Sequence, residues 1–259
     1  MPGLRHGFNT ARLLALLGLL GLLSLTWNLI AVPLHLLMPA QAGRRLGRAA
    51  IALVYRQFWA LAGLTGMLKI ESSVLDQFRE ERGLILVANH PSMLDALILV
   101  ARLPRSACIM KAELMRNIFL GAGARLARYI RNDSARSMVR LTVQDLKRGG
   151  QLVIFPEGTR TTQHPVNRFR PGVTLIAKLA GAPIQTVFID TDSPYLGKDW
   201  PIWKLPPLPI VFTVRAGERF APSGQPQALL QTLEDYFAAG VQAPNPPANP
   251  PANPPANPP

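Results

Sequence analysis

A long uncharged run near the N-terminus constrains this chain more than any other feature. From Leu13 to Gly43 the sequence contains no Asp, Glu, Lys or Arg. Its apolar part, LLALLGLLGLLSLTWNLIAV, has about the 20 residues that a helix needs to cross a bilayer. Pro33 follows directly and is expected to end this helix. We therefore predict a membrane anchor within residues 1–45, formed by a spanning or an embedded helix.

Two other interpretations of this run stay open. Ala40-Gln41-Ala42 resembles the small-residue site of a cleaved signal peptide, but the apolar run is longer than the roughly 7 to 15 residues of a typical signal peptide. A buried core helix is the third interpretation. Basic residues follow the run slightly more densely than they precede it, which favours a cytoplasmic location for the part that follows. They are Arg44, Arg45 and Arg48 after the run, and Arg5 and Arg12 before it.

Residues 46–70 are apolar again but carry Arg56 and Gln57 in their middle. Tyr55, Phe58 and Trp59 include the aromatic types that gather at membrane interfaces. We predict an amphipathic helix that lies on the bilayer or forms a hairpin with the first helix. A core helix of the following domain is the alternative.

From residue 71 to residue 241, short apolar runs alternate with amphipathic stretches. GLILVAN, QLVIF, PIQTVFID and LPIVFTVRAGERF have the composition of strands, and SACIM is a weaker example. Amphipathic or glycine-terminated helices are expected between and after them. The fold class predicted is α/β, with a largely parallel core sheet flanked by helices and an N-terminal membrane-embedded helix or helical hairpin. The proline-rich repeat over 242–259 is predicted to be a disordered tail, although a docking role is conceivable.

The charge balance points to an anionic partner. The formal net charge is +13, and arginine, which binds phosphate and carboxylate bidentately, supplies most of the positive charge. From Arg102 to Arg148 the basic residues far outnumber Glu113, Asp133 and Asp145, which suits anionic lipids, the phosphates of coenzyme A or an acyl-carrier protein. A single cysteine, Cys108, excludes a disulfide within the chain and a cysteine-based metal cluster. No metal-ligand spacing and no nucleic-acid recognition motif is present in the sequence.

A histidine and an aspartate follow the first buried strand. His90 comes directly after GLILVAN, at the carboxyl end where α/β sheets collect ligands, and Asp95 lies five residues later. If His90 lies outside the next helix and Asp95 in its second turn, the imidazole can fold back onto the carboxylate. The aspartate would then fix the tautomer of the histidine, and the other ring nitrogen would accept a proton from a hydroxyl or from water. A purely structural hydrogen bond is the alternative.

The strand QLVIF also ends in polar residues. Glu157, Thr159 and Arg160 follow it, and Gly158 gives the loop backbone freedom. Such a loop is suited to binding a phosphate or a hydroxyl.

Together, NHPSMLD and the later FPEGTR resemble the glycerolipid acyltransferase family, whose best-known members are lysophosphatidate acyltransferases. The resemblance extends over roughly residues 70–215 and includes a middle block, KAELMRNIFLGAGARLARYIR, and a fourth block, APIQTVFID. It implies direct acyl transfer from acyl-CoA or acyl-carrier protein to the hydroxyl of a lysolipid, with no metal and no cofactor beyond this co-substrate. No Gly-x-Ser-x-Gly elbow exists in the chain, which agrees with the absence of an acyl-serine.

The resemblance also assigns roles to residues. His90 would be the general base and Asp95 its orienting partner. The other residues would bind substrate, and Arg160 would contact phosphate. They are Glu157, Gly158, Thr159, Arg160, Arg131 and Arg170. The protein is expected at the bacterial inner membrane, on anionic lipids, with its catalytic domain facing the cytoplasm.

The acceptor stays open between 1-acyl-glycerol-3-phosphate, which the resemblance favours, and another lysolipid such as lyso-ornithine lipid. The family's proline is missing from NIFLG in the middle block, and Gln185 and Thr186 interrupt the fourth block. Other functions weighed are a non-catalytic lipid- or carrier-binding protein, a membrane hydrolase and a nucleic-acid-binding protein. The intact set of polar residues argues against the first, and the apolar N-terminus argues against the last.

Overall fold

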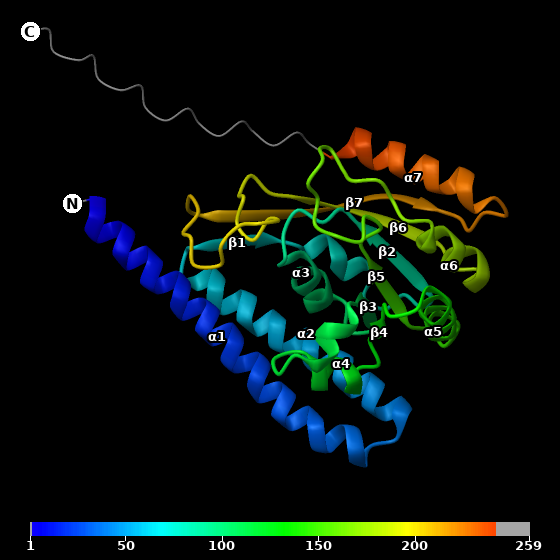
Figure 1. The fold of residues 1–259 in the computed structure, drawn as a ribbon, viewed down its shortest axis with the longest axis horizontal. Coiled ribbons are helices and arrows are strands. Elements are labelled where there is room, and N and C mark those ends of the chain that lie inside the picture. Colours follow the sequence, from blue (N-terminus) through cyan, green and yellow to red (C-terminus); the bar gives the residue numbers. More distant parts are fainter. Residues whose placement is uncertain (1, 242–259) are drawn as a thin grey trace, which may run out of the picture.

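The computed structural model describes residues 2–241 of the chain (Figure 1), so the predicted tail over 242–259 lies outside the described residues. Its centre is a seven-stranded sheet in the order β1-β7-β6-β2-β5-β3-β4. The strands are β1 (Leu68–Glu71), β2 (Leu84–Ala88), β3 (Ser106–Met110), β4 (Ile130–Arg131), β5 (Gln151–Ile154), β6 (Ile184–Asp190) and β7 (Ile210–Phe220).

Neighbouring strands are parallel except for the pair β6 and β7. The two central strands β2 and β5 are buried along their whole length, as strands covered on both faces must be. The predicted α/β class with a largely parallel sheet is therefore confirmed.

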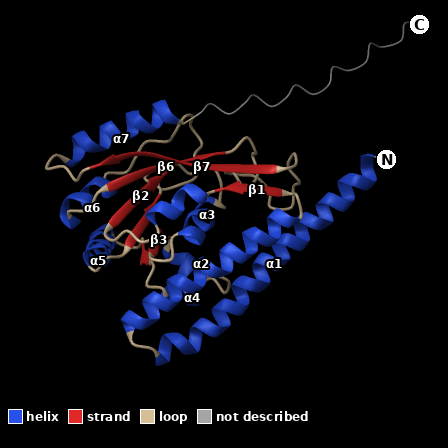
Figure 2. Cartoon of the chain, turned by 180° about the vertical axis from the view of Figure 1, so that it is seen from behind, coloured by secondary structure: helices blue, strands red, loops and turns tan. Residues whose placement is uncertain are grey.

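Helices cover both faces of the sheet, as Figure 2 shows from behind. On β2, Leu84, Leu86 and Ala88 belong to the core on the side of the first three helices, whereas Ile85 and Val87 belong to the core on the opposite side. This alternation is the two-residue period of a strand. The helices are α1 (Pro2–Leu37), α2 (Ala40–Leu64), α3 (Asp95–Arg102), α4 (Gly121–Leu126), α5 (Ala135–Lys147), α6 (Gly172–Ala180) and α7 (Pro226–Gly240).

The N-terminal helices α1 and α2 form a hairpin that runs along one side of the domain (Figure 1). One face of α1 packs against the domain, where Leu13, Leu16 and Ala31 are buried. The other face is exposed, with Leu29 at 66% and Leu36 at 78% exposure. Pro33 lies inside α1 and does not end it, which corrects the expectation above. A proline removes only one helical hydrogen bond, and here the helix continues to Leu37.

The second helix ends earlier than the predicted stretch 46–70. It begins at Ala40 and ends at Leu64, and residues Leu68–Glu71 form the edge strand β1. Gly66, with φ at +69°, makes the turn between them. Because β1 has only four residues, its sequence is too short to show whether it follows the period of a helix or of a strand.

Several short elements had no sequence signal. They are the two-residue strand β4, the six-residue helix α4, and the 3₁₀ helices Ser73–Phe78 and Ala112–Arg116. By contrast, the ends of α5 and α6 follow rules that the sequence shows: Ser134 caps α5 with its side chain, and Gly181 ends α6 in the left-handed conformation.

Candidate active site

The two polar stretches lie side by side at the carboxyl edge of the sheet. Strands β2 and β5 are parallel neighbours, with Val87 opposite Ile154 near their ends. Residues 89–95 follow β2 and residues 155–161 follow β5, so the topology brings both stretches to one place.

His90 and Asp95 form the pair that the sequence predicts. The Nδ1 atom of His90 lies 2.8 Å from Oδ2 of Asp95, and the side chains are 18% and 0% exposed. Asp95 is the first residue of α3, not part of its second turn, and the turn over Pro91–Leu94 carries the imidazole back to it. With the proton on Nδ1 directed to the carboxylate, Nε2 is the nitrogen left to accept a proton.

Asp95 is a fully buried carboxylate. Its Oδ2 also accepts the backbone N–H of Ser92 at 2.8 Å. Among the described residues its Oδ1 is buried without a hydrogen-bond partner. Burial raises the pKa of the Asp95 carboxyl, and the hydrogen bonds from His90 and Ser92 oppose that rise. The aspartate therefore holds the imidazole from inside the protein, out of contact with solvent.

An aromatic ring supports His90 from the side. Phe155, the first residue after β5, stacks on the imidazole with ring centroids 4.1 Å apart and planes inclined by 19°. Sequence reasoning did not identify Phe155. The only signal in the sequence was its position directly after the strand QLVI and before Pro156. This position is informative only once β5 is known to be the neighbour of β2.

Glu157 is buried and fully engaged with the protein. Its Oε1 accepts the backbone N–H of His90 at 3.0 Å and the hydroxyl of Thr161 at 2.8 Å, and its Oε2 accepts the N–H of Asn167 at 2.9 Å. The N–H of Thr161 in turn donates to the carbonyl of His90 at 2.7 Å. The geometry favours a role for Glu157 in positioning His90, whereas the resemblance suggests contact with the acceptor.

Two further residues fix the histidine loop, and neither was predicted. Asn89 is buried and exchanges two hydrogen bonds with Ile189 of β6, at 2.9 and 2.8 Å. Ser92 donates its hydroxyl to the carbonyl of Tyr195 at 3.1 Å. His90 is thus held between β6, the loop at 193–197 and the loop that follows β5.

The other predicted binding residues of the stretch after β5 form no hydrogen bond with His90 in the described part of the chain. Nη1 of Arg160 donates to the carbonyls of Leu196 and Gly197, at 2.9 and 2.8 Å. Gly158 has φ at +71°, and a Cβ there would lie 2.4 Å from Nε of Arg170, so the arginine packs directly over the glycine. Thr159 and Arg170 are exposed.

Arg131 lies apart from the other candidates. It ends β4 at the same edge of the sheet, but β5 and β3 separate that strand from β2. Its side chain is 59% exposed and forms a salt bridge with Asp133. Among the described residues, no group of His, Cys, Asp and Glu has the arrangement of a metal site.

Three comparisons with known proteins found similar sequences or structures. Residues 69–190 match the model of the Acyltransferase family. The lyso-ornithine lipid O-acyltransferase of Pseudomonas aeruginosa is 32% identical over 154 residues, which cover 54% of this chain and 58% of that protein. The crystal structure of the 1-acyl-sn-glycerophosphate (LPA) acyltransferase PlsC of Thermotoga maritima superposes with a TM-score of 0.56, at 20% identity, over 85% of this chain and 94% of that one.

The three comparisons support different conclusions. The structural likeness, at 20% identity, shows the fold. The sequence match spans less than two thirds of the curated relative. The family match includes both polar stretches, from β1 to the end of β6. Residues 69–190 of this chain are therefore similar to the acyltransferase family.

Proposed function

We propose that this protein is a membrane-bound O-acyltransferase that moves a fatty acyl group from a thioester donor to the hydroxyl of a lysolipid. The observation that carries the proposal is the His90–Asp95 pair. Its Nδ1 is held at 2.8 Å from a fully buried carboxylate, while Nε2 has no hydrogen bond with any described residue. A histidine held in this way is arranged to remove a proton from a hydroxyl.

The reaction needs no acyl-enzyme. His90 Nε2 takes the proton of the acceptor hydroxyl while that oxygen forms a bond to the thioester carbonyl carbon. The tetrahedral intermediate then expels the thiolate, which takes the proton back from the imidazolium. The products are an ester and the free thiol of coenzyme A or of an acyl-carrier protein. No cofactor beyond this donor takes part in the proposed reaction.

We infer that a lyso-ornithine-type lipid is the preferred acceptor. The relative from Pseudomonas aeruginosa that is 32% identical carries this activity in its name. The contacts of Arg160 do not distinguish the acceptors, because only its Nη1 donates to backbone carbonyls, and Nε and Nη2 stay able to contact a phosphate or a carboxylate bidentately. Lysophosphatidate is the second candidate, which the family resemblance of the sequence motifs supports.

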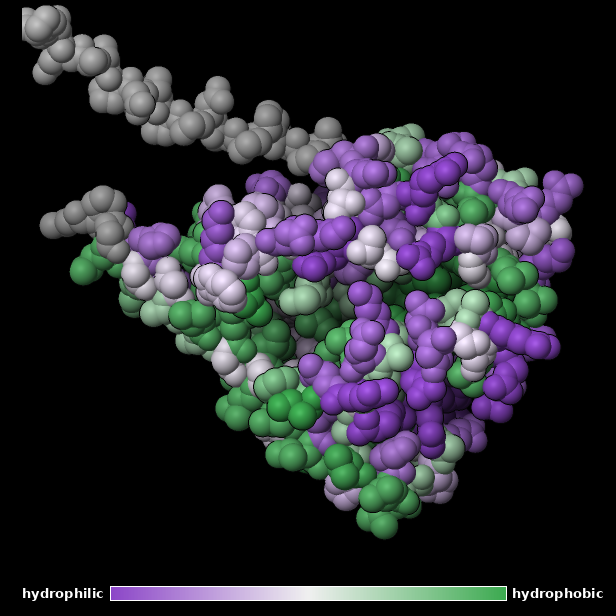
Figure 3. Space-filling view, in the orientation of Figure 1, coloured by the Kyte–Doolittle hydropathy of each residue, from purple (hydrophilic) through white to green (hydrophobic). Residues whose placement is uncertain are grey.

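The hairpin of α1 and α2 supports attachment to a membrane. Among the described residues, one helix, Leu4–Leu37, is long and apolar enough to cross a bilayer by length and composition. Figure 3 shows apolar residues along the edge of the molecule that α1 forms. Because α1 packs along the domain from Leu13 to Ala31, we propose that the hairpin is embedded in one leaflet and does not span both. Residues 71–241 would then be the catalytic domain, on the cytoplasmic side of a bacterial inner membrane.

Lipid mass spectrometry identifies the acceptor. Cells that contain the protein are compared with cells that lack it and with cells that contain the His90→Ala variant. We expect an acylated ornithine lipid to fall and its lyso form to rise in the last two. A fall in phosphatidate with a rise in lysophosphatidate would instead assign the second candidate. Unchanged lipids, or full rescue by the variant, would contradict an acyltransferase function.

A further inference from the structure

A cavity of about 370 Å³ lies between α2, β1 and the end of α3, apart from the candidate active site. Arg102 ends α3 and lines this cavity, whereas Asp95 begins the same helix. At 1.5 Å per residue, the two ends of the helix are roughly 10 Å apart. Neither His90 nor any residue of the loop after β5 lines the cavity.

The charged residues that line the cavity are all basic. They are Arg56 of α2, Lys69 of β1 and Arg102 of α3, and the other lining residues are uncharged. Lys69 pairs with Glu71 at 2.7 Å. Arg102 donates to Asp76 at 2.9 Å and to Ser72 at 3.3 Å, through Nη1 and Nε. Its Nη2 has no hydrogen bond with a described residue.

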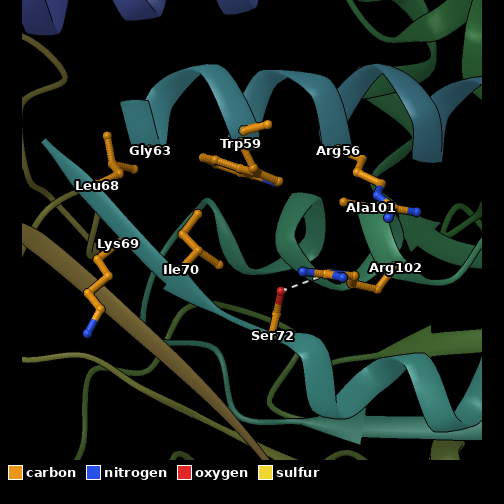
Figure 4. A pocket seen from close by; sticks show the side chains of 10 residues that line it. Arg56, Trp59, Gly63, Leu68, Lys69, Ile70, Ser72, Ala101 and Arg102 are labelled. Atoms are coloured by element: carbon orange, nitrogen blue, oxygen red, sulfur yellow. Dashed lines mark hydrogen bonds between the residues drawn. The ribbon is translucent and has the colours of Figure 1, made fainter. Parts of the chain in front are cut away.

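Among the three basic residues that line the cavity, Arg56 is the one that forms no salt bridge with a described residue. It is the only charged residue between Ala49 and Leu68, and no described residue forms a salt bridge or side-chain hydrogen bond with it. Figure 4 shows its guanidinium directed from α2 toward Arg102. Two guanidinium groups that face one cavity repel each other, and an anion with several oxygens would relieve that repulsion and use their free N–H groups.

The position of the cavity indicates where such an anion comes from. Leu53, Leu61 and Leu64, on the neighbouring face of α2, are 57%, 46% and 85% exposed. Trp59, an aromatic type that favours the membrane interface, lines the cavity itself. If α2 buries these leucines in lipid, Arg56 of α2 and Arg102 at the end of the neighbouring α3 would lie at the depth of the head groups.

We propose that this cavity binds the phosphate of an anionic phospholipid, as a site separate from acyl transfer. The proposal rests on the membrane association proposed above but not on the acyltransferase reaction. Basic pockets beside membrane-embedded helices bind such head groups, and each basic residue contributes roughly 1 kcal/mol, or about fivefold in affinity.

Native mass spectrometry of the full chain in neutral detergent tests the site, because it counts retained lipids and does not depend on activity. The protein is mixed with equal amounts of phosphatidylglycerol and phosphatidylcholine. We expect the wild type to retain one phosphatidylglycerol molecule more often than phosphatidylcholine. In Arg56→Gln the ratio of retained phosphatidylglycerol to phosphatidylcholine should be about fivefold lower. Arg45→Gln is the matched control, since Arg45 is exposed on the same helix and does not line the cavity.

Equal retention of phosphatidylglycerol by the wild type and Arg56→Gln would overturn the proposal. An equal loss of retention in Arg56→Gln and Arg45→Gln would also overturn it, because it would indicate general electrostatic attraction of the lipid to basic residues. Two soluble competitors distinguish the source of the phosphate. Inorganic phosphate and coenzyme A are expected to leave the retained lipid in place. Displacement by either at millimolar concentration would assign the cavity to a soluble ligand. Circular dichroism of each variant verifies that it is folded.

Discussion

At the scale of single residues, the site depends on how firmly His90 is held. Asp95 holds its Nδ1, Phe155 stacks on its ring, and Glu157 accepts its backbone N–H. Asp95 comes from the start of α3, and Phe155 and Glu157 come from the stretch that follows β5. A side chain held in this way loses little freedom when a substrate binds, which would be the physical advantage of a preorganised site if His90 is the proposed base.

Asp95→Asn tests the tautomer of His90. An amide can still accept from Ser92 but no longer stabilises an imidazolium, and we expect kcat to fall roughly 10³- to 10⁴-fold, as in the serine protease triad. Steady-state kinetics with a saturating acceptor measure this change. A loss of less than tenfold would contradict the role of Asp95.

The same variant has a pH signature in stability. Burial raises the pKa of Asp95 in the folded state, so the folded protein holds this proton more tightly than the unfolded chain. Wild-type stability therefore falls as pH rises from about 4 through the raised pKa, and the asparagine variant lacks this loss. We expect the difference in melting temperature, variant minus wild type, to increase over that range. Parallel pH profiles would show that Asp95 is not destabilised by its burial.

Phe155 is expected to act through the orientation of His90. Phe155→Leu removes a stacked pair worth about 0.5–1.5 kcal/mol, so kcat should fall roughly two- to tenfold with the KM of the acceptor unchanged. Phe155→Tyr keeps the ring and should restore kcat. If the leucine variant instead raises KM alone, Phe155 contacts the substrate and does not position the base.

Contacts between residues close in sequence could be predicted from the sequence, and contacts between distant residues could not. His90 and Asp95 are five residues apart, so local reasoning found the pair that the structure contains. Phe155 and Asn89 act through neighbours about 65 and 100 residues away, and their contacts exist only because β5 and β6 flank β2. The catalytic and binding roles themselves stay predictions.

At the scale of elements, a buried ion pair joins the hairpin to the domain. Arg48 of α2 contacts both oxygens of Asp145 of α5 at 2.9 Å and also donates to the carbonyls of Ala127 and Arg105. The side chain of Arg48 is 3% exposed. This network fixes α2 against the body of the domain, so hairpin and sheet should move as one unit.

Asp145→Ala should destabilise the protein because it leaves the Arg48 guanidinium buried without its carboxylate. Removal of one partner of a buried pair costs about 3–5 kcal/mol. The exposed pair of Arg131 and Asp133 offers a matched control, and Asp133→Ala should cost less than about 1 kcal/mol. Chemical unfolding in detergent measures both values, and equal losses would contradict a structural role for the buried network.

Elements with a clear period were predictable from sequence, and short ones were not. The strands β2, β5, β6 and β7 lie where the apolar runs predict them. The edge strand β1 and the two-residue β4 depend on pairing with β7 and β3, which is tertiary information. The prediction that Pro33 ends the first helix was wrong, because the loss of a single hydrogen bond does not stop a helix whose flanking turns are intact.

At the scale of the whole molecule, the apolar face of the hairpin should bind the membrane. Leu29 on α1 is 66% exposed in the structure, so Leu29→Glu should leave the fold intact. It should lower the membrane-bound fraction in vesicle flotation, since burial of a leucine is worth about 1.5–3 kcal/mol. Leu141→Glu, at a leucine that is 40% exposed on α5, is the control and should float like the wild type. Equal behaviour of the two variants would show that the hairpin is not the membrane-binding surface.

The central claim is that His90 catalyses direct acyl transfer to a lysolipid hydroxyl. The most direct test measures thiol release and ester formation together, with purified wild type and His90→Ala, a labelled acyl thioester, and lyso-ornithine lipid present or absent. We predict that the wild type releases thiol only with acceptor, in equal amount to the ester, without a labelled enzyme intermediate, and that the variant makes neither product. Thiol release without acceptor, or transfer by the variant at the wild-type rate, would contradict the account.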